Sequence, residues 1–517
     1  MSTSAFVKST FILTLATLLS KVLGSIFRIP LQNIAGDEVL GIYSIVYPVY
    51  MVALILSVAG IPTAISKLIA EARAEGNQLK IREIYMTASI LALLFGLISF
   101  LLVQKFADSI ANILGGPEVR YALIIVATTL LIAPYMAVYR GYFQGFEDMR
   151  PTGVSQVFEQ FVRVILILVI AYYLVSIDAT PEVISGGVMV GSVFGALASL
   201  IYLLIIYHRS PFKVKKSRKY TLTSFKTWSR KILKISIPIA IGSITMALLN
   251  FVDSVTIPIG LRQAGYPSQD IHYLFGLYSR GSTIVQIATV FASSIVLPLI
   301  PLMTKKMAER DFTGTRKIIE KTHYMTYLIS WPATFGLLAL TLPLNLGLFT
   351  NLEGSAVLAI IGFSSVFTSL VLLGTGILQG LNLANIGAYI IVFGVMLKTI
   401  FNVFFIQTFG IAGAAWATLL VYVILFITNS IYIKKHIRFT LFNTHTQKII
   451  IASGLMGFFI GVPTYMIDFE TWSRLQAILY LCVAIIAGVC LYFLQLFVYK
   501  EIDIKFLKQM IKNRKQN

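Results

Sequence analysis

The chain has 517 residues, of which 57% are hydrophobic and 12% are charged, and its formal net charge is +20. A soluble protein of this length is never so apolar, so the solvent of this chain must be a lipid bilayer. Its basic residues cluster between apolar runs, where anionic lipid head groups attract them, and this excludes nucleic acid as a favoured partner.

Apolar runs of about 20 residues, the length that crosses a bilayer as a helix, recur along the whole chain. They predict an all-α polytopic membrane protein of about fourteen transmembrane helices. The first run has no small-residue cleavage site after it, so we interpret it as a retained helix and not as a signal peptide. The predicted helices cover residues 5–29, 39–66, 84–103, 119–142, 152–176, 183–207, 232–260, 272–302, 322–345, 354–379, 384–407, 411–433, 448–467 and 474–499.

Lysine and arginine residues are distributed unevenly over the predicted loops. With a cytoplasmic N-terminus, 32 of them fall on the cytoplasmic side and four on the opposite side. Because basic residues concentrate in cytoplasmic loops, both termini are predicted to lie inside the cell, which requires an even number of helices. The expected location is the inner (plasma) membrane.

Two short motifs recur at one constant spacing. Gly-Ile-Tyr-Ser at 41–44 returns as Gly-Leu-Tyr-Ser at 276–279, and Gly-Tyr-Phe-Gln-Gly at 141–145 returns as Gly-Ile-Leu-Gln-Gly at 376–380, both 235 positions later. Close helix packing explains small residues in each motif but not the shared spacing. Six helices per repeat would give both copies the same orientation, as in transporters with parallel repeats. The predicted parts are an N-lobe (1–207), a basic cytoplasmic linker (208–231), a C-lobe (232–433) and a C-terminal helix pair with a basic tail (434–517).

Charged residues within the predicted spans are the candidates for function. A charge at the centre of a helix costs about 2.5–3.5 kcal/mol on insertion scales, so it faces a cavity or a partner. Cations outnumber acids, and the guanidinium fork donates two hydrogen bonds to a phosphate, so the pattern predicts an anionic cargo such as a pyrophosphate. The residues are Lys8, Lys21, Arg28, Arg163, Arg280 and Lys398, with Glu159 and Asp253 as the acids.

The expected roles differ. Glu159 and Arg163 are four positions apart on one helix, which favours a structural ion pair over substrate contact. Asp253 and Arg280 lie at similar depth, so they either pair with each other or form a switch in which Asp253, by proton or cation binding, releases Arg280. Lys8 is near enough to the cytoplasmic end to reach the head groups.

The other cations are predicted to bind substrate together with Arg280. Lys21 lies in the middle of its span, and Arg28 lies toward the outer end, where a cavity or the outer head groups are both within reach. Lys398 is expected either to bind cargo or to neutralise a neighbouring dipole.

Sequence motifs of catalysis are lacking. There is no Walker lysine loop, no His-Glu-x-x-His and no Gly-x-Ser-x-Gly. Cys482 and Cys490 lie in one apolar run without histidine or acidic companions, which indicates packing and not a metal site. We therefore expect no enzyme, no catalytic residue, no bound metal and no cofactor.

Four segments resemble a known family: Ser-Lys-Val-Leu-Gly at 20–24 followed by Arg28, Gly-Ile-Pro-Thr-Ala-Ile-Ser-Lys at 60–67, Arg-Gly-Tyr-Phe-Gln-Gly at 140–145, and residues 156–163. They resemble the polysaccharide-transport branch of the multidrug/oligosaccharidyl-lipid/polysaccharide flippase superfamily. Within it the chain looks most like the stage V sporulation protein B and lipid II flippase (MurJ-type) group, over its full length.

This resemblance implies two six-helix lobes around a central cationic cavity that opens alternately to either side, with a groove for a polyprenyl tail at helices 13 and 14. The family's essential cavity cations match Lys21, Arg28 and Arg280. Lysine stands at 21 where the family usually has arginine, and the helix 2 arginine of the lipid II flippases has no counterpart between Tyr43 and Ser66. Related polyprenyl-pyrophosphate sugars therefore stay open as cargo.

The resulting hypothesis is a flippase that moves a polyprenyl-pyrophosphate-linked oligosaccharide, either lipid II or a related precursor, from the cytoplasmic to the outer leaflet. Membrane potential, Na+ or H+ would drive it, and envelope-biosynthesis proteins are potential partners besides anionic lipid head groups. Two alternatives remain: a multidrug exporter of the same superfamily, whose organic cations favour acidic or aromatic cavities, and a non-transporting scaffold for envelope enzymes.

Overall fold

The computed structural model describes residues 3–58, 60–211 and 220–499, and every regular element in these ranges is helical. Helices satisfy all backbone hydrogen bonds within one segment, as a lipid environment demands. In chain order they are α1 (Thr3–Ile26), α2 (Arg28–Val58), α3 (Ile61–Ala74), α4 (Gln78–Lys105), α5 (Ala107–Ile113), η1 (Pro117–Val119), α6 (Arg120–Ala127), α7 (Thr129–Gly145), α8 (Arg150–Ser176), α9 (Pro181–Arg209), α10 (Leu222–Gln263), α11 (Ser268–Ala308), α12 (Phe312–Ala339), α13 (Thr341–Phe349), α14 (Ser355–Phe363), α15 (Ser365–Gly380), α16 (Ala384–Phe409), α17 (Ile411–His436), α18 (Thr444–Met466), η2 (Phe469–Thr471) and α19 (Arg474–Val498).

Each predicted span overlaps at least one of these helices, but the second one is placed differently. The sequence predicts a loop before residue 39, whereas α2 begins at Arg28 and runs through a kink at Gly36, where φ is 82°. The predicted span 39–66 also breaks near Gly60, whose φ of 84° ends the helical path before α3 begins. Only glycine adopts such angles without strain, so both breaks coincide with glycine.

The number of membrane crossings is a separate question. In the described part of the chain, ten helical segments are long and apolar enough to span a membrane, or eleven if the pair α12 and α13, bent by 79°, is one span. One of the ten is the 64-residue run Phe11–Ala74, which contains more than one helix. The prediction of fourteen crossings with both termini inside therefore stays a prediction.

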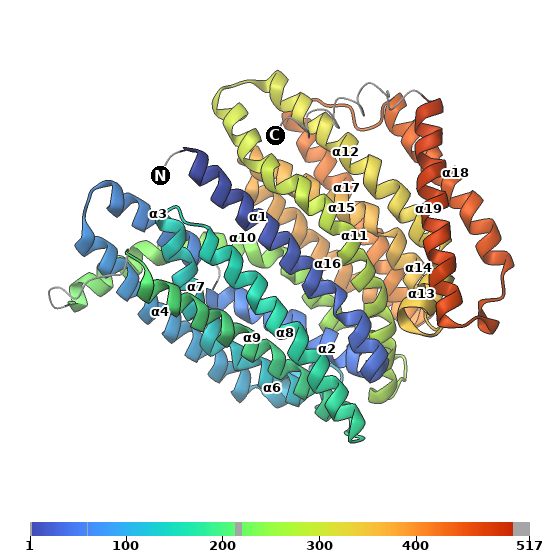
Figure 1. Ribbon diagram of the computed structural model, residues 1–517, viewed down its shortest axis with the longest axis horizontal. Helices are drawn as coiled ribbons and strands as arrows, with labels where there is room; N and C mark the ends of the chain where they lie inside the picture. Colours follow the sequence, from blue (N-terminus) through green and yellow to red (C-terminus); the bar gives the residue numbers. More distant parts are fainter. Residues whose placement is uncertain (1–2, 59, 212–219, 500–517) are drawn as a thin grey trace. The chain divides into compact units, whose positions relative to one another are not determined.

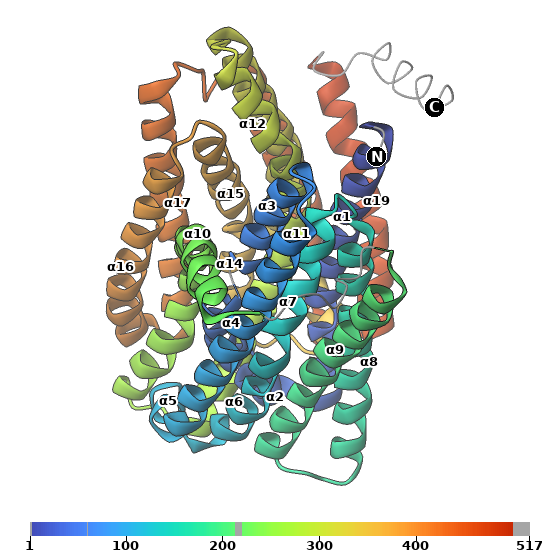
Figure 2. The same ribbon diagram turned by 90° about the vertical axis from the view of Figure 1, so that its left-hand side faces the viewer.

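The chain divides into two compact units. Unit 1 comprises Met1–Ser279 and Ile391–Ala414, and unit 2 comprises Arg280–Ile390 and Ala415–Asn517. In unit 1, α8 lies beside α9 and α1 (Figure 1), and α3 packs against both α4 and α7 (Figure 2). In unit 2, α12 packs on α15 and α18, and α19 on α13 and α18.

The predicted lobe boundaries stay predictions. Residues 212–219 of the predicted linker and the basic tail from residue 500 lie outside the described residues. The side chain of Lys8, predicted to reach the head groups, also lies outside the described part.

The first repeated motif lets α2 and α11 cross closely within unit 1. A Cβ atom at Gly41 would overlap the carbonyl oxygen of His272, and one at Gly276 would overlap the carbonyl oxygen of Asp37. The two glycines are repeat equivalents, so the same motif position supplies both sides of one crossing.

The second repeated motif makes equivalent contacts inside each unit. Its glycines pack on α3 in unit 1 and on α11 in unit 2. The contacted residues are 234 positions apart, one less than the spacing of the motifs, and this agreement supports an internal repeat. The contacts are Gly141 with Pro62, Gly145 with Ile69, Gly376 with Val296, and Gly380 with Met303.

Candidate functional site

Arg28 is buried against tyrosines in unit 1. Its side chain belongs to a residue only 7% exposed, and its guanidinium carbon lies 5.9 Å from the ring centre of Tyr43 and 6.0 Å from that of Tyr47. The two rings are four positions apart on α2 and stack at 5.5 Å, which places both beside the cation. Within the described part of the chain, Arg28 has no carboxylate partner and its Nε has no hydrogen-bond acceptor.

The position of Arg28 corrects the sequence interpretation. The sequence places Arg28 toward the outer end of the first helix, where a cavity and the outer head groups are both within reach. In the structure the first helix ends at Ile26, and Arg28 is the first residue of α2. Its burial among aromatic rings turns it toward the protein interior.

A second cationic group lies where α7, α8 and α9 meet. Glu159 accepts from Arg163 Nη2 at its Oε1 (3.0 Å) and from Arg140 Nη2 at its Oε2 (2.8 Å). Arg140 also donates to the hydroxyls of Ser155 and Ser199, at 3.0 and 3.1 Å. One carboxylate thus serves two arginines, so this group carries an excess positive charge.

Tyr47 joins the two groups. The hydroxyl of Tyr47 accepts a hydrogen bond of 3.4 Å from Arg163 Nη1, while its ring lies beside Arg28. We call the six residues the Tyr47 cluster: Arg28, Tyr43, Tyr47, Arg140, Glu159 and Arg163. Its formal charge is +2, because three guanidinium groups face one carboxylate.

Lys21 stands apart from this cluster in its exposure. It lies on α1 of unit 1, and its side chain is exposed in the isolated chain. Within the described residues it forms no ion pair. Lys21 is therefore less enclosed by protein than Arg28, whose guanidinium group is largely buried.

Asp253 and Lys398 form an ion pair inside unit 1. Lys398 Nζ lies 2.7 Å from Asp253 Oδ2, which also accepts from the Tyr278 hydroxyl at 2.8 Å. Asn402 Nδ2 donates to Asp253 Oδ1 at 3.1 Å and to Thr256 Oγ1 at 2.7 Å. The sequence left two roles open for Asp253, an ion pair with Arg280 or a switch that releases Arg280. Within unit 1 the structure pairs Asp253 with Lys398, which lies 145 positions later in the chain.

Arg280 contacts a helix break in unit 2. Its Nη1 donates to Asn345 Oδ1 (2.9 Å), to Asn351 Oδ1 (2.8 Å) and to the Glu353 carbonyl (3.3 Å). Its guanidinium carbon lies 5.2 Å from the ring centre of Phe349, and the residue is 1% exposed. Arg280 therefore holds the end of α13 and the turn before α14 in place.

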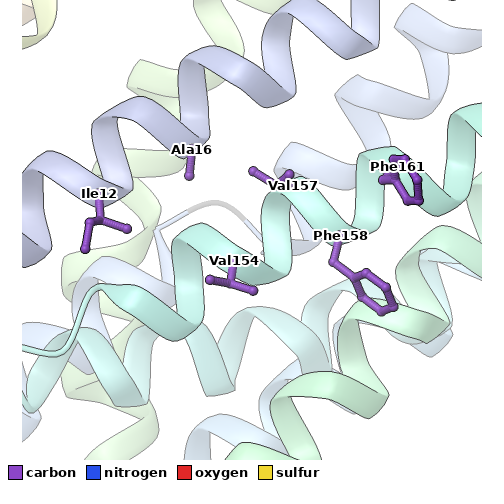
Figure 3. A pocket seen from close by; sticks show the side chains of 6 residues that line it. All are labelled: Ile12, Ala16, Val154, Val157, Phe158 and Phe161. Carbon is purple, nitrogen blue, oxygen red and sulfur yellow. The ribbon is translucent and has the colours of Figure 1, made fainter.

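An apolar groove between α1 and α8 lies on unit 1 (Figure 3). Thr17 Oγ1 donates to Gln156 Oε1 at 3.0 Å and ties the two helices together beside it. Every lining side chain is a hydrocarbon, so the groove offers no group for an anionic head group. The lining residues are Ile12, Ala16, Val154, Val157, Phe158 and Phe161.

The sequence interpretation did not name three residues that take part in these contacts: Arg140, Tyr47 and Asn402. Arg140 lies near the end of the predicted span 119–142 and is not among the charged candidates from the sequence, yet from α7 it donates to Glu159. Tyr47 and Asn402 are uncharged, and a search for charges in spans passes over them. The signal for Arg140 is its place in the Arg-Gly-Tyr-Phe-Gln-Gly motif, and the signal for Asn402 is its position four residues after Lys398 on one helix face.

Comparison with known proteins places the chain in a family. The family described as "Polysaccharide biosynthesis protein" matches residues 6–307. An uncharacterized membrane protein of Bacillus subtilis, YabM, is 30% identical over 79% of this chain and 76% of its own. The lipid II flippase MurJ of Bacillus subtilis is 25% identical over 99% of this chain and 97% of its own. The stage V sporulation protein B of the same organism is 27% identical over 81% of this chain and 81% of its own.

Solved structures agree on the fold. A lipid II flippase MurJ in an inward closed conformation superposes with a TM-score of 0.71 at 15% identity, covering 95% of this chain and 99% of that one. An inward-facing multidrug resistance MATE transporter of the MOP superfamily superposes with a TM-score of 0.60 at 17% identity, covering 82% of this chain and 94% of that one. The chain is a multi-pass protein of the cell membrane, and it belongs to the polysaccharide biosynthesis protein family, in the branch of the MOP superfamily that contains the lipid II flippases.

Proposed function

We propose that this protein is a flippase that moves a polyprenyl-pyrophosphate-linked sugar from the cytoplasmic to the outer leaflet by alternating access. The observation that carries the proposal is Arg28, a buried guanidinium group with aromatic neighbours, no carboxylate partner in the described residues and an unsatisfied Nε. Burying such a charge costs free energy. An anionic ligand that accepts hydrogen bonds from the guanidinium group of Arg28 would offset this cost.

The charge of the Tyr47 cluster supports an anionic cargo. Arg140 and Arg163 share Glu159, so Glu159 neutralises only one of the cluster's three positive charges. A pyrophosphate brings negative charge and several acceptor oxygens, which match guanidinium forks in geometry. An organic cation would be repelled by the same groups.

The roles of the other predicted substrate-binding residues follow from their surroundings. We propose that Lys21 attracts the head group, since this residue is exposed in the isolated chain. We assign Arg280 to holding the α13–α14 turn, from which it would reach cargo only after that turn rearranges. Lys398 is bound to Asp253, so we do not retain it as a cargo contact.

The proposal needs no covalent step, because a flippase exchanges the position of an intact lipid. The relatives whose functions are named support transport: one is a lipid II flippase and another a probable low-salt glycan biosynthesis flippase of Haloferax volcanii. For the present chain we propose the shared chemical class, a sugar on a polyprenyl pyrophosphate, and leave the sugar open.

The test combines depletion with purified protein. Cells depleted of the protein should accumulate one polyprenyl-linked precursor on the cytoplasmic face, and the wild-type gene should restore its transfer. In proteoliposomes, Arg28→Gln should abolish flipping of that precursor, and Arg28→Lys should retain a small fraction of it because the charge stays but the fork is lost.

A matched control is Arg316→Gln, which removes an exposed cation paired with Glu320 and should leave flipping unchanged. If depletion moves no precursor between the leaflets but sensitises cells to organic cations, the drug exporter is the better assignment. If envelope defects occur and Arg28→Gln protein corrects them fully, a scaffold role replaces transport.

A further inference from the structure

Asp253 and Lys398 form a buried ion pair inside unit 1. Three further oxygen-bearing side chains adjoin Asp253 directly or through one another, and all of them are buried. They are Tyr278, Asn402 and Thr256.

The carboxylate is saturated by donors. Its Oδ2 receives Lys398 Nζ at 2.7 Å and the Tyr278 hydroxyl at 2.8 Å, and its Oδ1 receives the Asn402 amide at 3.1 Å. A metal ion binds to Asp253 only if the ammonium leaves, because both would compete for the same oxygen at contact distance. As long as Lys398 is charged and in place, the site excludes free cations.

The oxygens of Asp253 and of its polar neighbours are of the kinds that a hard cation prefers. Carboxylate, amide and hydroxyl oxygens bind alkali and alkaline-earth ions, and charged residues of this kind in transporters mark ion sites. Asn402 is 0% exposed, and among the residues that the structure describes its Oδ1 has no hydrogen-bond partner, so one further oxygen of the cluster is available for a ligand.

Charge balance selects a monovalent ion. Asp253 and Lys398 together are neutral, which suits their burial at 5% and 1% exposure. Replacing the ammonium by Na+ preserves this neutrality, whereas a divalent ion would leave an uncompensated positive charge in a membrane-embedded site.

We propose that the ammonium of Lys398 occupies, as a covalently tethered substitute, a monovalent cation site formed by Asp253, Asn402 and Thr256, so that the wild-type protein does not bind Na+ there and removal of the lysine creates a Na+ site. This inference goes beyond the proposed transport function and does not depend on the cargo. It also leaves the wild-type protein without Na+ coupling through Asp253.

The experiment measures thermal unfolding of the purified full-length protein in NaCl and in N-methyl-D-glucamine chloride at equal ionic strength. Lys398→Ala should unfold at a lower temperature than wild type in the organic salt, and Na+ should raise its midpoint in a saturable way, as expected for a ligand of the native state. The wild type and Lys398→Arg, which keeps a tethered cation, should show the same midpoint in both salts.

Two further variants make the result decisive. Lys398→Gln repeats the test with less lost volume, and Asp253→Asn/Lys398→Ala removes the carboxylate and should abolish the Na+ response. Binding of radioactive Na+ should reach one ion per chain for Lys398→Ala and fall to background for the double variant.

The inference is overturned if folded Lys398→Ala and Lys398→Gln proteins respond equally to both salts. It is also overturned if the single variants fail to fold in Na+ while the double variant folds, since Na+ then does not replace the ammonium. A Na+ response of the wild type that Asp253→Asn removes would equally exclude it. None of these outcomes depends on flipping activity, so this inference and the proposed function fail separately.

Discussion

The guanidinium carbon of Arg28 lies 6.0 Å from the centre of the Tyr47 ring. A cation held by a ring face, and not by a carboxylate, keeps its N–H groups for another acceptor. The hydroxyl of the same tyrosine accepts from Arg163, so the ring and the hydroxyl serve different arginines. This division of labour can be tested by removing either part of Tyr47.

Tyr47→Phe removes the hydroxyl, and Tyr47→Leu removes the ring as well. Since the contact with Arg163 is long at 3.4 Å, we expect Tyr47→Phe to keep most of the flipping activity. Tyr47→Leu should lower the rate about 10-fold, the scale of a cation–π contact of roughly 1–2 kcal/mol. Flipping assays in proteoliposomes measure both. Equal losses in the two variants would contradict a role for the ring.

Arg280 should contribute to stability as well as to transport. Asn345→Ala removes a buried acceptor of a charged donor, which should lower the free energy of unfolding by about 1.5–3 kcal/mol. Arg280→Ala combined with Asn345→Ala should cost less than the sum of the single changes, because both remove the same contact. Denaturant unfolding in detergent measures this coupling.

Asn385→Ala, an exposed change near the start of α16, is the control for Asn345→Ala and should leave stability within about 0.5 kcal/mol of wild type. If Arg280→Ala protein is as stable as wild type but inactive, Arg280 acts only on cargo. The assignment of Arg280 to the α13–α14 turn would then be wrong.

Glu159 should be essential for stability because two arginines depend on it. Glu159→Gln leaves Arg140 and Arg163 facing each other without a counter-charge, and we expect a loss of about 3 kcal/mol. Adding Arg140→Gln should restore part of the loss. The control Glu309→Gln breaks exposed pairs with Lys305 and Lys306, which are worth little in water. A Glu159→Gln protein no less stable than the control would refute the argument.

The sequence predicted what depends on local pattern. Hydropathy located a helix in each predicted span, and spacing along one helix face suggested the contact between Glu159 and Arg163, which the structure shows at 3.0 Å. Both the helix positions and this contact depend on residues close together in the chain, for which helix geometry determines which side chains are neighbours.

What the sequence missed depends on tertiary packing or on single backbone angles. Arg140 contacts Glu159 from a different helix, and Lys398 contacts Asp253 from a helix 145 positions away. The spacing of residues along one helix therefore cannot predict either pair. The kink at Gly36 lies in a segment that the hydropathy pattern assigns to a loop. Its positive φ is available to any glycine, but composition does not tell which glycine uses it.

The crossing of α2 and α11 offers the last prediction. Gly276→Ala would place a methyl group on the backbone carbonyl of Asp37, an atom that cannot move away as a flexible side chain can. The helices must separate, and we expect a loss of about 1–3 kcal/mol in unfolding free energy together with reduced activity. The repeat equivalent, Gly41→Ala, should have a similar effect through the carbonyl of His272.

The matched control for this crossing is Gly454→Ala in α18. Its new methyl group would have the Phe335 ring at 3.9 Å, an ordinary contact, and alanine is the better helix former, so stability should not fall. Thermal unfolding of the three variants decides the matter. If Gly276→Ala and Gly41→Ala match Gly454→Ala, the crossing tolerates a methyl group, and the spacing of the two motifs must have another cause than this contact.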